Sequence, residues 1–125
     1  MQGGSTNTMK FTVQRKTWAN HNEYKGPSRL LNQWGNSCCL GHCALNLGIS
    51  DLKGHSTPAQ HAVTHPEALA KFEEVGFIKD GRDTPFSDEA MRINDGLIGG
   101  DWSQAQREAA LKQLFAEHDH ELEFV

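Results

Sequence analysis

The residues of this chain that are best suited to chemistry are three cysteines between positions 38 and 43 and two histidines further along. Cys39 and Cys43 are four residues apart, which places both on one face of a helix, and His61 and His65 share that spacing. Two thiolates and two imidazoles are a ligand set of structural zinc. However, the 17 residues between the pairs exceed the usual gap of about 12 to 15. Pro66 also restricts any helix that carries both histidines. We therefore expect no metal and assign the cysteines to the core.

A cysteine nucleophile is a second possibility for the same segment. Cys38 and Cys39 fall near the start of a predicted helix, where the positive end of the helix dipole would lower the pKa of a thiol. The chain has no cysteine signature of a protease or oxidoreductase, since Cys-Cys is not Cys-x-x-Cys. It also lacks Gly-x-Gly-x-x-Gly and Walker patterns. We predict neither enzymatic activity nor a cofactor, and keep a thiol- or zinc-dependent enzyme as the third hypothesis.

A group of polar residues in the second half of the chain favours ligand binding. Asn94 and Asp95 end a predicted helix, and such pairs are common helix caps. They could equally recognise base or ribose edges through paired donors and acceptors. Arg107, in the first turns of the next helix, offers a planar fork that matches phosphate. Phe86 or Trp34 would supply a stacking surface for a purine. Capping and nucleotide binding both remain open for this group.

Hydrophobic periodicity predicts the elements that must position these residues. Residues 10–14 and 121–125 alternate as half-buried strands that should pair, and 29–32 and 77–78 are candidate short strands. Helices are expected over 38–47 with Ser37 as N-cap, from Pro66 to 75, over 87–93, and after the capping box Ser103–Gln106. The pattern predicts an α+β fold, in which a small antiparallel sheet that includes the N- and C-terminal strands packs with three or four helices. Residues 1–9 are expected to be a flexible leader and 10–125 a single domain.

Composition restricts the class of protein further. The chain has 125 residues and a net charge of −4, without a basic stripe for nucleic acid, so we expect no direct nucleic-acid binding. No apolar run is long enough to cross a membrane, and the start lacks the pattern of a secretory signal. Three cysteines, two of them adjacent, suit a reducing compartment. We expect a cytoplasmic protein.

The order of short motifs resembles a group of small proteins encoded by tailed phages and prophages. The distinctive blocks are Cys-Cys-Leu-Gly, beginning at Cys38, and Ile-Asn-Asp, beginning at Ile93. Arg29-Leu-Leu-Asn precedes them, and Arg107-Glu and Leu122-Glu-Phe-Val follow. Other members of the group place Lys-Met before the two cysteines, where this chain has Asn36-Ser37. Within the group, the chain is similar to the Thoeris anti-defence proteins, which sequester cyclic ADP-ribose-type signals without cleaving them.

This resemblance implies a homo-oligomeric binding protein that takes up a cyclic nucleotide, of the cyclic ADP-ribose type or a cyclic oligonucleotide, at sites shared between subunits. The implied ligand contacts are Asn94, Asp95 and Arg107, with Phe86 as a stacking surface and Arg29 as a second phosphate partner. On this hypothesis Arg107→Ala abolishes ligand binding and leaves thermal stability nearly unchanged. The alternative is a phage protein that inhibits a bacterial immune effector, such as a CRISPR nuclease, by protein–protein binding.

Overall fold

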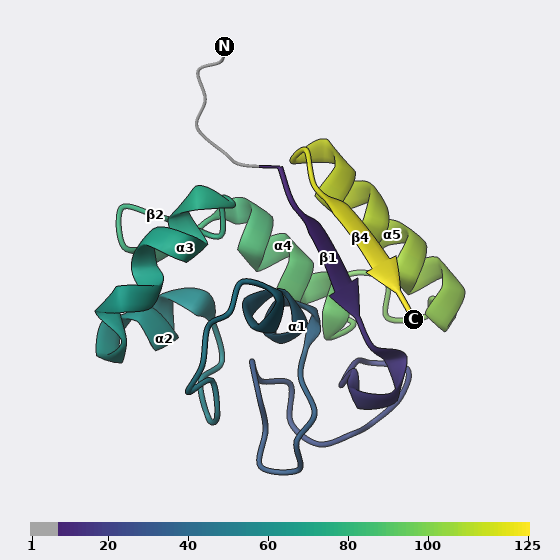
Figure 1. Ribbon diagram of the computed structural model, residues 1–125. Coiled ribbons are helices and arrows are strands. Elements are labelled where there is room, and N and C mark those ends of the chain that lie inside the picture. Colours follow the sequence, from purple (N-terminus) through teal and green to yellow (C-terminus); the bar gives the residue numbers. More distant parts are fainter. Residues whose placement is uncertain (1–7) are drawn as a thin grey trace.

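Two strands from distant parts of the sequence lie side by side in the computed structural model, which describes residues 8–125. β1 (Lys10–Val13) pairs in parallel with β4 (Glu121–Phe124), as Figure 1 shows. The alternating pattern turns Phe11 and Val13 into the core, both with 0 % exposure. Lys10 stays on the surface, 3.5 Å from the Glu123 carboxylate. The predicted pairing of these two segments is confirmed.

The predicted antiparallel direction of this pair is wrong. More than a hundred residues separate β1 from β4 (Lys10 pairs with Glu121), so no tight hairpin imposes an antiparallel arrangement. Instead α5 (Gln104–Glu117) runs back along β4, and a short turn at Asp119 brings the chain to the start of β1. There the Glu121 amide donates to the Met9 carbonyl at 2.9 Å, and both strands then continue in the same direction.

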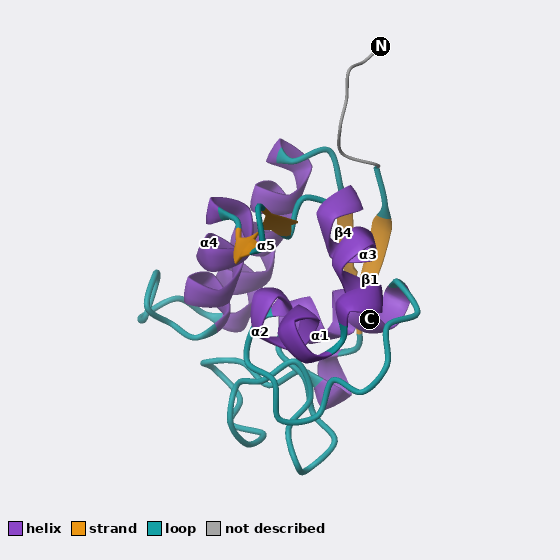
Figure 2. Cartoon of the chain, turned by 90° about the vertical axis from the view of Figure 1, so that its left-hand side faces the viewer, coloured by secondary structure: helices purple, strands orange, loops and turns teal. Residues whose placement is uncertain are grey.

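The helices confirm the α+β class with differences in detail. Five α-helices occur in the described part of the chain, rather than three or four: α1 (Cys39–Asn46), α2 (Pro58–Thr64), α3 (Leu69–Glu74), α4 (Pro85–Asn94) and α5. Two 3₁₀ helices, η1 (Arg15–Thr17) and η2 (Pro66–Ala68), and an antiparallel hairpin of β2 (Ile78–Lys79) and β3 (Arg82–Asp83) complete the fold. Figure 2 shows most of the loops gathered at one end of the molecule.

The structure differs from the sequence-based predictions at several helix ends and at one predicted strand. The N-cap of α1 is Cys38 rather than Ser37, and its side chain makes no capping hydrogen bond. Pro66 opens a 3₁₀ turn before α3 because His65 takes the non-helical backbone typical of a residue before proline. Residues 29–32 form no strand, only a bridge between Leu31 and Lys53. The capping box is confirmed, since Ser103 and Gln106 bond each other's backbone reciprocally.

The core joins the sheet to α4, α5 and the β2–β3 hairpin through aromatic contacts. Phe11 stacks on Phe77 with ring centroids 5.7 Å apart and meets Phe115 edge-on at 6.0 Å. Phe86 meets Phe115 edge-on at 4.9 Å. These packed rings connect the first strand to the N-terminal turn of α4, so the position of that turn depends on the core.

The central helix α1 lies beside β1 and is buried along most of its length. Gly41 lets the preceding loop cross it closely, because a Cβ there would lie 1.9 Å from the Leu30 carbonyl oxygen. No helix within residues 8–125 is long and apolar enough to span a membrane.

The start of the domain lies at or before Met9. The Met9 amide donates to Nδ1 of His120 at 3.0 Å, and its side chain packs against the core. Residues 1–7 of the predicted leader lie outside the described part of the chain.

The buried His120 makes the stability of this fold depend on pH. Its Nδ1 accepts from Met9, so Nε2 carries the proton donated to the Val75 carbonyl at 2.8 Å. Burial lowers the pKa of His120, and also those of His42 and His61. A lowered folded pKa means that the unfolded chain binds protons more readily. Stability should be full above the unfolded pKa of about 6.5 and fall as the pH drops from there through the folded values.

Chemical denaturation between pH 8 and pH 5 measures this dependence. The variant His120→Gln should reduce the slope, because it removes one buried imidazole. A free energy of unfolding that stays constant from pH 8 to pH 5 would contradict the role given to these histidines.

Candidate functional site

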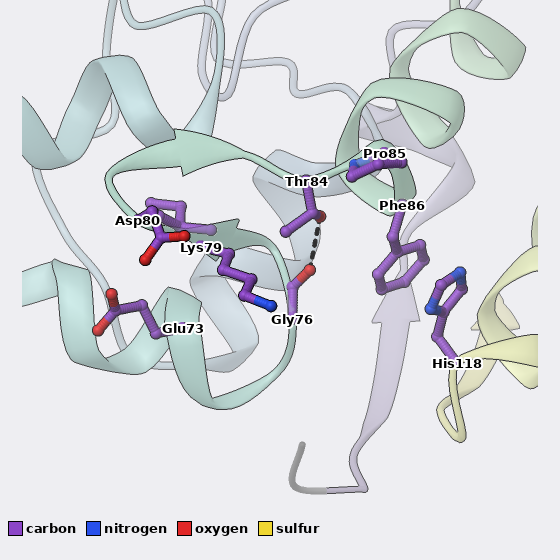
Figure 3. Close-up of a pocket in the computed structure, with 9 residues that line it drawn as sticks. Glu73, Gly76, Lys79, Asp80, Thr84, Pro85, Phe86 and His118 are labelled. Atoms are coloured by element: carbon purple, nitrogen blue, oxygen red, sulfur yellow. Dashed lines mark hydrogen bonds between the residues drawn. The ribbon is translucent and has the colours of Figure 1, made fainter. Parts of the chain in front are cut away.

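A cavity of about 560 Å³ opens between α3, the β2–β3 hairpin, the start of α4 and the turn after α5. Its volume lies within the roughly 300 to 1,000 Å³ typical of small-molecule sites. Figure 3 shows the rings of Phe86 and His118 face to face at one end, with Lys79, Asp80 and Glu73 toward the other. The lining consists of Glu73, Gly76, Ile78, Lys79, Asp80, Thr84, Pro85, Phe86 and His118.

A helix-capping pair, Thr84 and Pro85, fixes one wall of this cavity. Thr84 is the N-cap of α4, and Pro85 occupies the first helical position, where no amide donor is needed. The Thr84 hydroxyl accepts from the Ser87 amide at 3.2 Å and donates to the Gly76 carbonyl at 2.6 Å. It thereby ties the start of α4 to the end of α3.

The hairpin that carries the cavity's cations is closed by a two-residue turn. Asp80 and Gly81 both have positive φ, at 54° and 76°. Asp-Gly is a favoured pair for the type I′ turn that joins strands with the natural twist. The turn places Lys79 on one strand and Arg82 on the other, directly opposite each other in the register.

The aromatic end of the cavity is a stacked pair. The rings of Phe86 and His118 lie 4.1 Å apart at an angle of 12°. Phe86 is buried, with 3 % exposure, whereas His118 is exposed. A planar ligand would therefore extend this stack mainly through the imidazole of His118, with Phe86 as the rigid support behind it.

The other end of the cavity is polar and carries both signs of charge. A second hollow of about 450 Å³ shares Lys79, Asp80, Thr84 and Pro85 with the first and adds Arg82 and Asp83. Neither Lys79 nor Arg82 forms an ion pair with another residue of the described chain. Glu73 and Asp80 supply carboxylates that can accept hydrogen bonds from hydroxyl or amino groups. The arrangement suits a ligand with one or two negative charges better than a polyphosphate.

The structure places only Phe86 of the five predicted site residues in this cavity. Arg29 lies elsewhere, half-buried, and donates from Nη1 to the Ser56 hydroxyl at 2.6 Å. Asp95 is exposed at the C-cap of α4 and borders a different, smaller pocket. Asn94 and Arg107 are fully buried. The five residues therefore do not form one site in this structure.

Asn94 uses its side-chain amide within the fold. Its Oδ1 accepts from the Trp18 indole at 2.7 Å and from the Cys39 amide at 3.0 Å. Its Nδ2 donates to the Ala19 carbonyl at 3.0 Å. One amide thus joins the end of α4 to the start of α1 and to the loop after η1, and all these groups are withdrawn from solvent.

Arg107 likewise bonds the protein's own backbone. Its guanidinium donates to the carbonyls of Ile93 at 2.6 Å and Gly99 at 2.8 Å, and to Oδ1 of Asn22 at 2.6 Å. The Trp102 ring lies 5.9 Å from the guanidinium carbon. Burial lowers the pKa of Arg107, but from so high an ordinary value that the group stays charged at neutral pH. The donors that would meet phosphate already bond protein oxygens.

The three cysteines lie in the core and are free thiols. Burial raises the pKa of Cys38 to about 12 and the pKa values of Cys39 and Cys43 well above the ordinary value. The dipole of the short helix α1 does not offset this loss of solvation. Since the thiolate is the reactive form, the structure gives no support to a cysteine nucleophile.

The histidines of the zinc hypothesis lie in a separate cluster. His61 stacks on His65 at 4.3 Å, and its Nε2 lies 2.9 Å from the Ser50 carbonyl. Cys39 instead contacts α4, with Sγ 3.8 Å from the Ala90 carbonyl. Within residues 8–125, no three histidine, cysteine or acidic side chains stand in a metal-binding arrangement.

Lys79, Thr84 and His118 line the cavity but are not among the site residues predicted from the sequence. The Thr84-Pro85 pair was a usable signal, because Thr followed by Pro marks the start of a helix. His118 had no such signal, since nothing local indicates that the turn after α5 lies against the N-terminus of α4.

No protein-family model matches the chain, and searches of curated proteins and of solved structures find no significant match either.

Replacing Arg107 should destabilise the protein, in contrast to the expectation from the sequence. Arg107→Ala leaves the Ile93 and Gly99 carbonyls and Oδ1 of Asn22 without this donor, at about 1–3 kcal/mol for each acceptor that is buried, and opens a cavity. The free energy of unfolding, measured by urea denaturation, should fall by at least about 3 kcal/mol. Arg92→Ala, at an exposed arginine of α4, is the matched control and should change it by less than about 1 kcal/mol. A loss for Arg107→Ala no larger than that of the control would contradict the structural role.

The cysteines should be unreactive in the folded protein. Their burial and raised pKa values predict that an aromatic disulfide reagent at pH 8 modifies less than about one thiol per chain over an hour. In 6 M guanidinium chloride all three should react. Rapid reaction of one thiol in the native protein would show an accessible cysteine and revive the thiol-enzyme hypothesis.

Proposed function

We propose that this protein binds a nucleotide in the cavity between Phe86, His118 and the β2–β3 hairpin, and holds it without cleaving it. The observation that carries the proposal is the combination, in one ligand-sized cavity, of a stacked aromatic end with a polar end that presents Lys79 beside two carboxylates. A heterocyclic base would extend the Phe86–His118 stack. Phosphate would meet Lys79, with Arg82 in reach of a second phosphate in the adjoining hollow.

The two carboxylates of the cavity, Glu73 and Asp80, restrict the class of nucleotide that it can bind. Glu73 and Asp80 favour hydroxyl or amino groups and oppose a high density of negative charge. A cyclic nucleotide carries few phosphate charges and keeps its ribose hydroxyls, so it fits this mixture better than a triphosphate. The resemblance to phage anti-defence proteins supports the same class, namely a cyclic ADP-ribose-type signal or a cyclic oligonucleotide.

The lining of the cavity supports sequestration over thiol catalysis. None of the three cysteines lies there, and the side chains with the strongest pKa shifts are buried elsewhere. The proposal includes a homo-oligomer, because the resemblance implies sites shared between subunits. We also propose that the protein acts in the cytoplasm of an infected cell, where it would meet a cyclic nucleotide signal.

Inhibition of an immune effector by protein contact is the alternative. Exposed aromatic residues on the loop between η1 and α1 favour it, since such residues are common anchors of protein interfaces. Binding of an effector together with no affinity for free nucleotides would support this alternative.

Thermal shift with a ligand panel tests the proposed function. The panel contains cyclic ADP-ribose isomers, cyclic di- and trinucleotides, NAD and ADP-ribose. A cyclic ligand should raise the melting temperature, and mass spectrometry after heat denaturation should recover it intact. A stabilising ligand recovered in altered form would indicate an enzyme, and no shift across the panel would overturn the nucleotide proposal.

Variants of the cavity locate the binding site. Lys79→Ala should weaken binding about tenfold, since a hydrogen bond to a charged group contributes about 1.5–3 kcal/mol. His118→Ala should also weaken it by removing the exposed stacking ring. Lys112→Ala, at an exposed lysine of α5, is the matched control and should bind normally. Equal affinities for all three variants would place the ligand outside this cavity.

A further inference from the structure

Two large aromatic side chains stand exposed on the loop between η1 and α1, away from the cavity described above. Tyr24 is 79 % and Trp34 59 % exposed. Their rings meet edge-on with centroids 6.0 Å apart. Trp34 also covers Gly26, where a Cβ would lie 2.6 Å from the indole ring. The two rings therefore form one aromatic surface on a loop that packs beneath them.

Hydrogen bonds hold this loop in place. Oδ1 of Asn20 accepts from the amides of Asn22 at 2.9 Å and Glu23 at 3.3 Å. Nδ2 of Asn32 donates to the carbonyls of Lys25 at 2.9 Å and Pro27 at 3.0 Å. Because side-chain bonds close the loop at both ends, the aromatic rings are presented by an ordered backbone. Such preorganisation reduces the entropy lost on binding a partner.

A pocket of about 160 Å³ lies beside Tyr24 and contains the carboxylate of Asp95. This carboxylate has a defined orientation, because Oδ1 accepts from the Ser28 hydroxyl at 2.5 Å and from Nδ2 of Asn94 at 3.0 Å. No hydrogen bond to Oδ2 occurs within residues 8–125. Asp95 also caps the C-terminus of α4, whose dipole adds negative potential there.

No cation of the described chain neutralises this carboxylate. Asp95 takes part in none of the ion pairs among residues 8–125. The ammonium of Lys25, a lysine of the same loop, donates instead to the carbonyls of Arg15 at 2.7 Å and Lys16 at 2.9 Å. His21 lines the pocket, and its Nε2 lies 2.9 Å from the Gly100 carbonyl. The net charge of −4 adds a general attraction for cations.

We propose that this pocket binds an arginine side chain of a partner protein, with the guanidinium paired to Asp95 and stacked on the Tyr24 ring. The volume fits one long side chain and is below that of small-molecule sites. A guanidinium suits the site because it is planar, stacks on aromatic faces and pairs with a carboxylate through a fork of donors. The pocket shares no residue with the cavity at Phe86, so this proposal is independent of the proposed function.

Nuclear magnetic resonance with matched peptides tests the proposal. The probes are the heptapeptide Gly-Ser-Gly-Arg-Gly-Ser-Gly and its twin with citrulline, which has the same shape without the charge. The arginine peptide should shift the amide signals of Tyr24, Gly26 and Asp95 and the Trp34 indole signal, with a dissociation constant in the millimolar range. The citrulline peptide should bind at least fivefold more weakly.

Two variants separate this pocket from general charge attraction. Asp95→Asn keeps the oxygen that accepts from Ser28 and should weaken arginine binding at least fivefold. Asp88→Asn removes an exposed carboxylate of the same helix and should leave the affinity unchanged. Equal binding of the two peptides, signal shifts confined to other parts of the molecule, or equal affinities of both variants would each overturn the proposal.

Discussion

The buried side chains of Asn94 and Arg107 form hydrogen bonds with backbone amides and carbonyls in the loops and at the helix ends of this fold. Asn94 bonds the loop after η1 and the first amide of α1, and Arg107 bonds the Ile93 carbonyl in the last turn of α4 and the Gly99 carbonyl beyond it. A buried polar group without a partner costs about 1–3 kcal/mol, so these bonds select one arrangement of the loops. They determine how α1, α4 and α5 are placed relative to one another.

Because these polar side chains bond the protein itself, a ligand must be bound by other residues. Asn94 and Arg107, which look like nucleotide contacts in the sequence, bond other groups of the protein, and open donors and acceptors occur at its turns. The hairpin of β2 and β3 presents Lys79 and Arg82 beside a stacked aromatic pair. The loop around Tyr24 presents an aromatic surface beside a carboxylate instead. The cavity at Phe86 thus offers a lysine beside carboxylates, whereas the pocket at Tyr24 offers a carboxylate without a lysine or arginine, which suits them to different partners.

The elements that were predicted well are those with local causes. Alternation identified β1 and β4, and the Ser103–Gln106 capping box correctly identified the start of α5. The elements that were missed depend on distant contacts. The parallel direction of the β1–β4 pair follows from the return of α5 along β4, and no local pattern carries that information. The segment before Pro66 had no clear periodicity, yet Thr57 caps a short helix there.

The sequence by itself determined the α+β class, the strongest helices and the assignment of the cysteines to the core, because these follow from periodicity, capping and burial preference. Only the tertiary structure decided that Arg107 and Asn94 bond backbone groups and that Phe86 supports a cavity with His118 and Lys79. The reason is that a guanidinium or an amide has the same donors whether it meets a ligand or a buried carbonyl. Packing between segments far apart in the chain determines which of the two it meets.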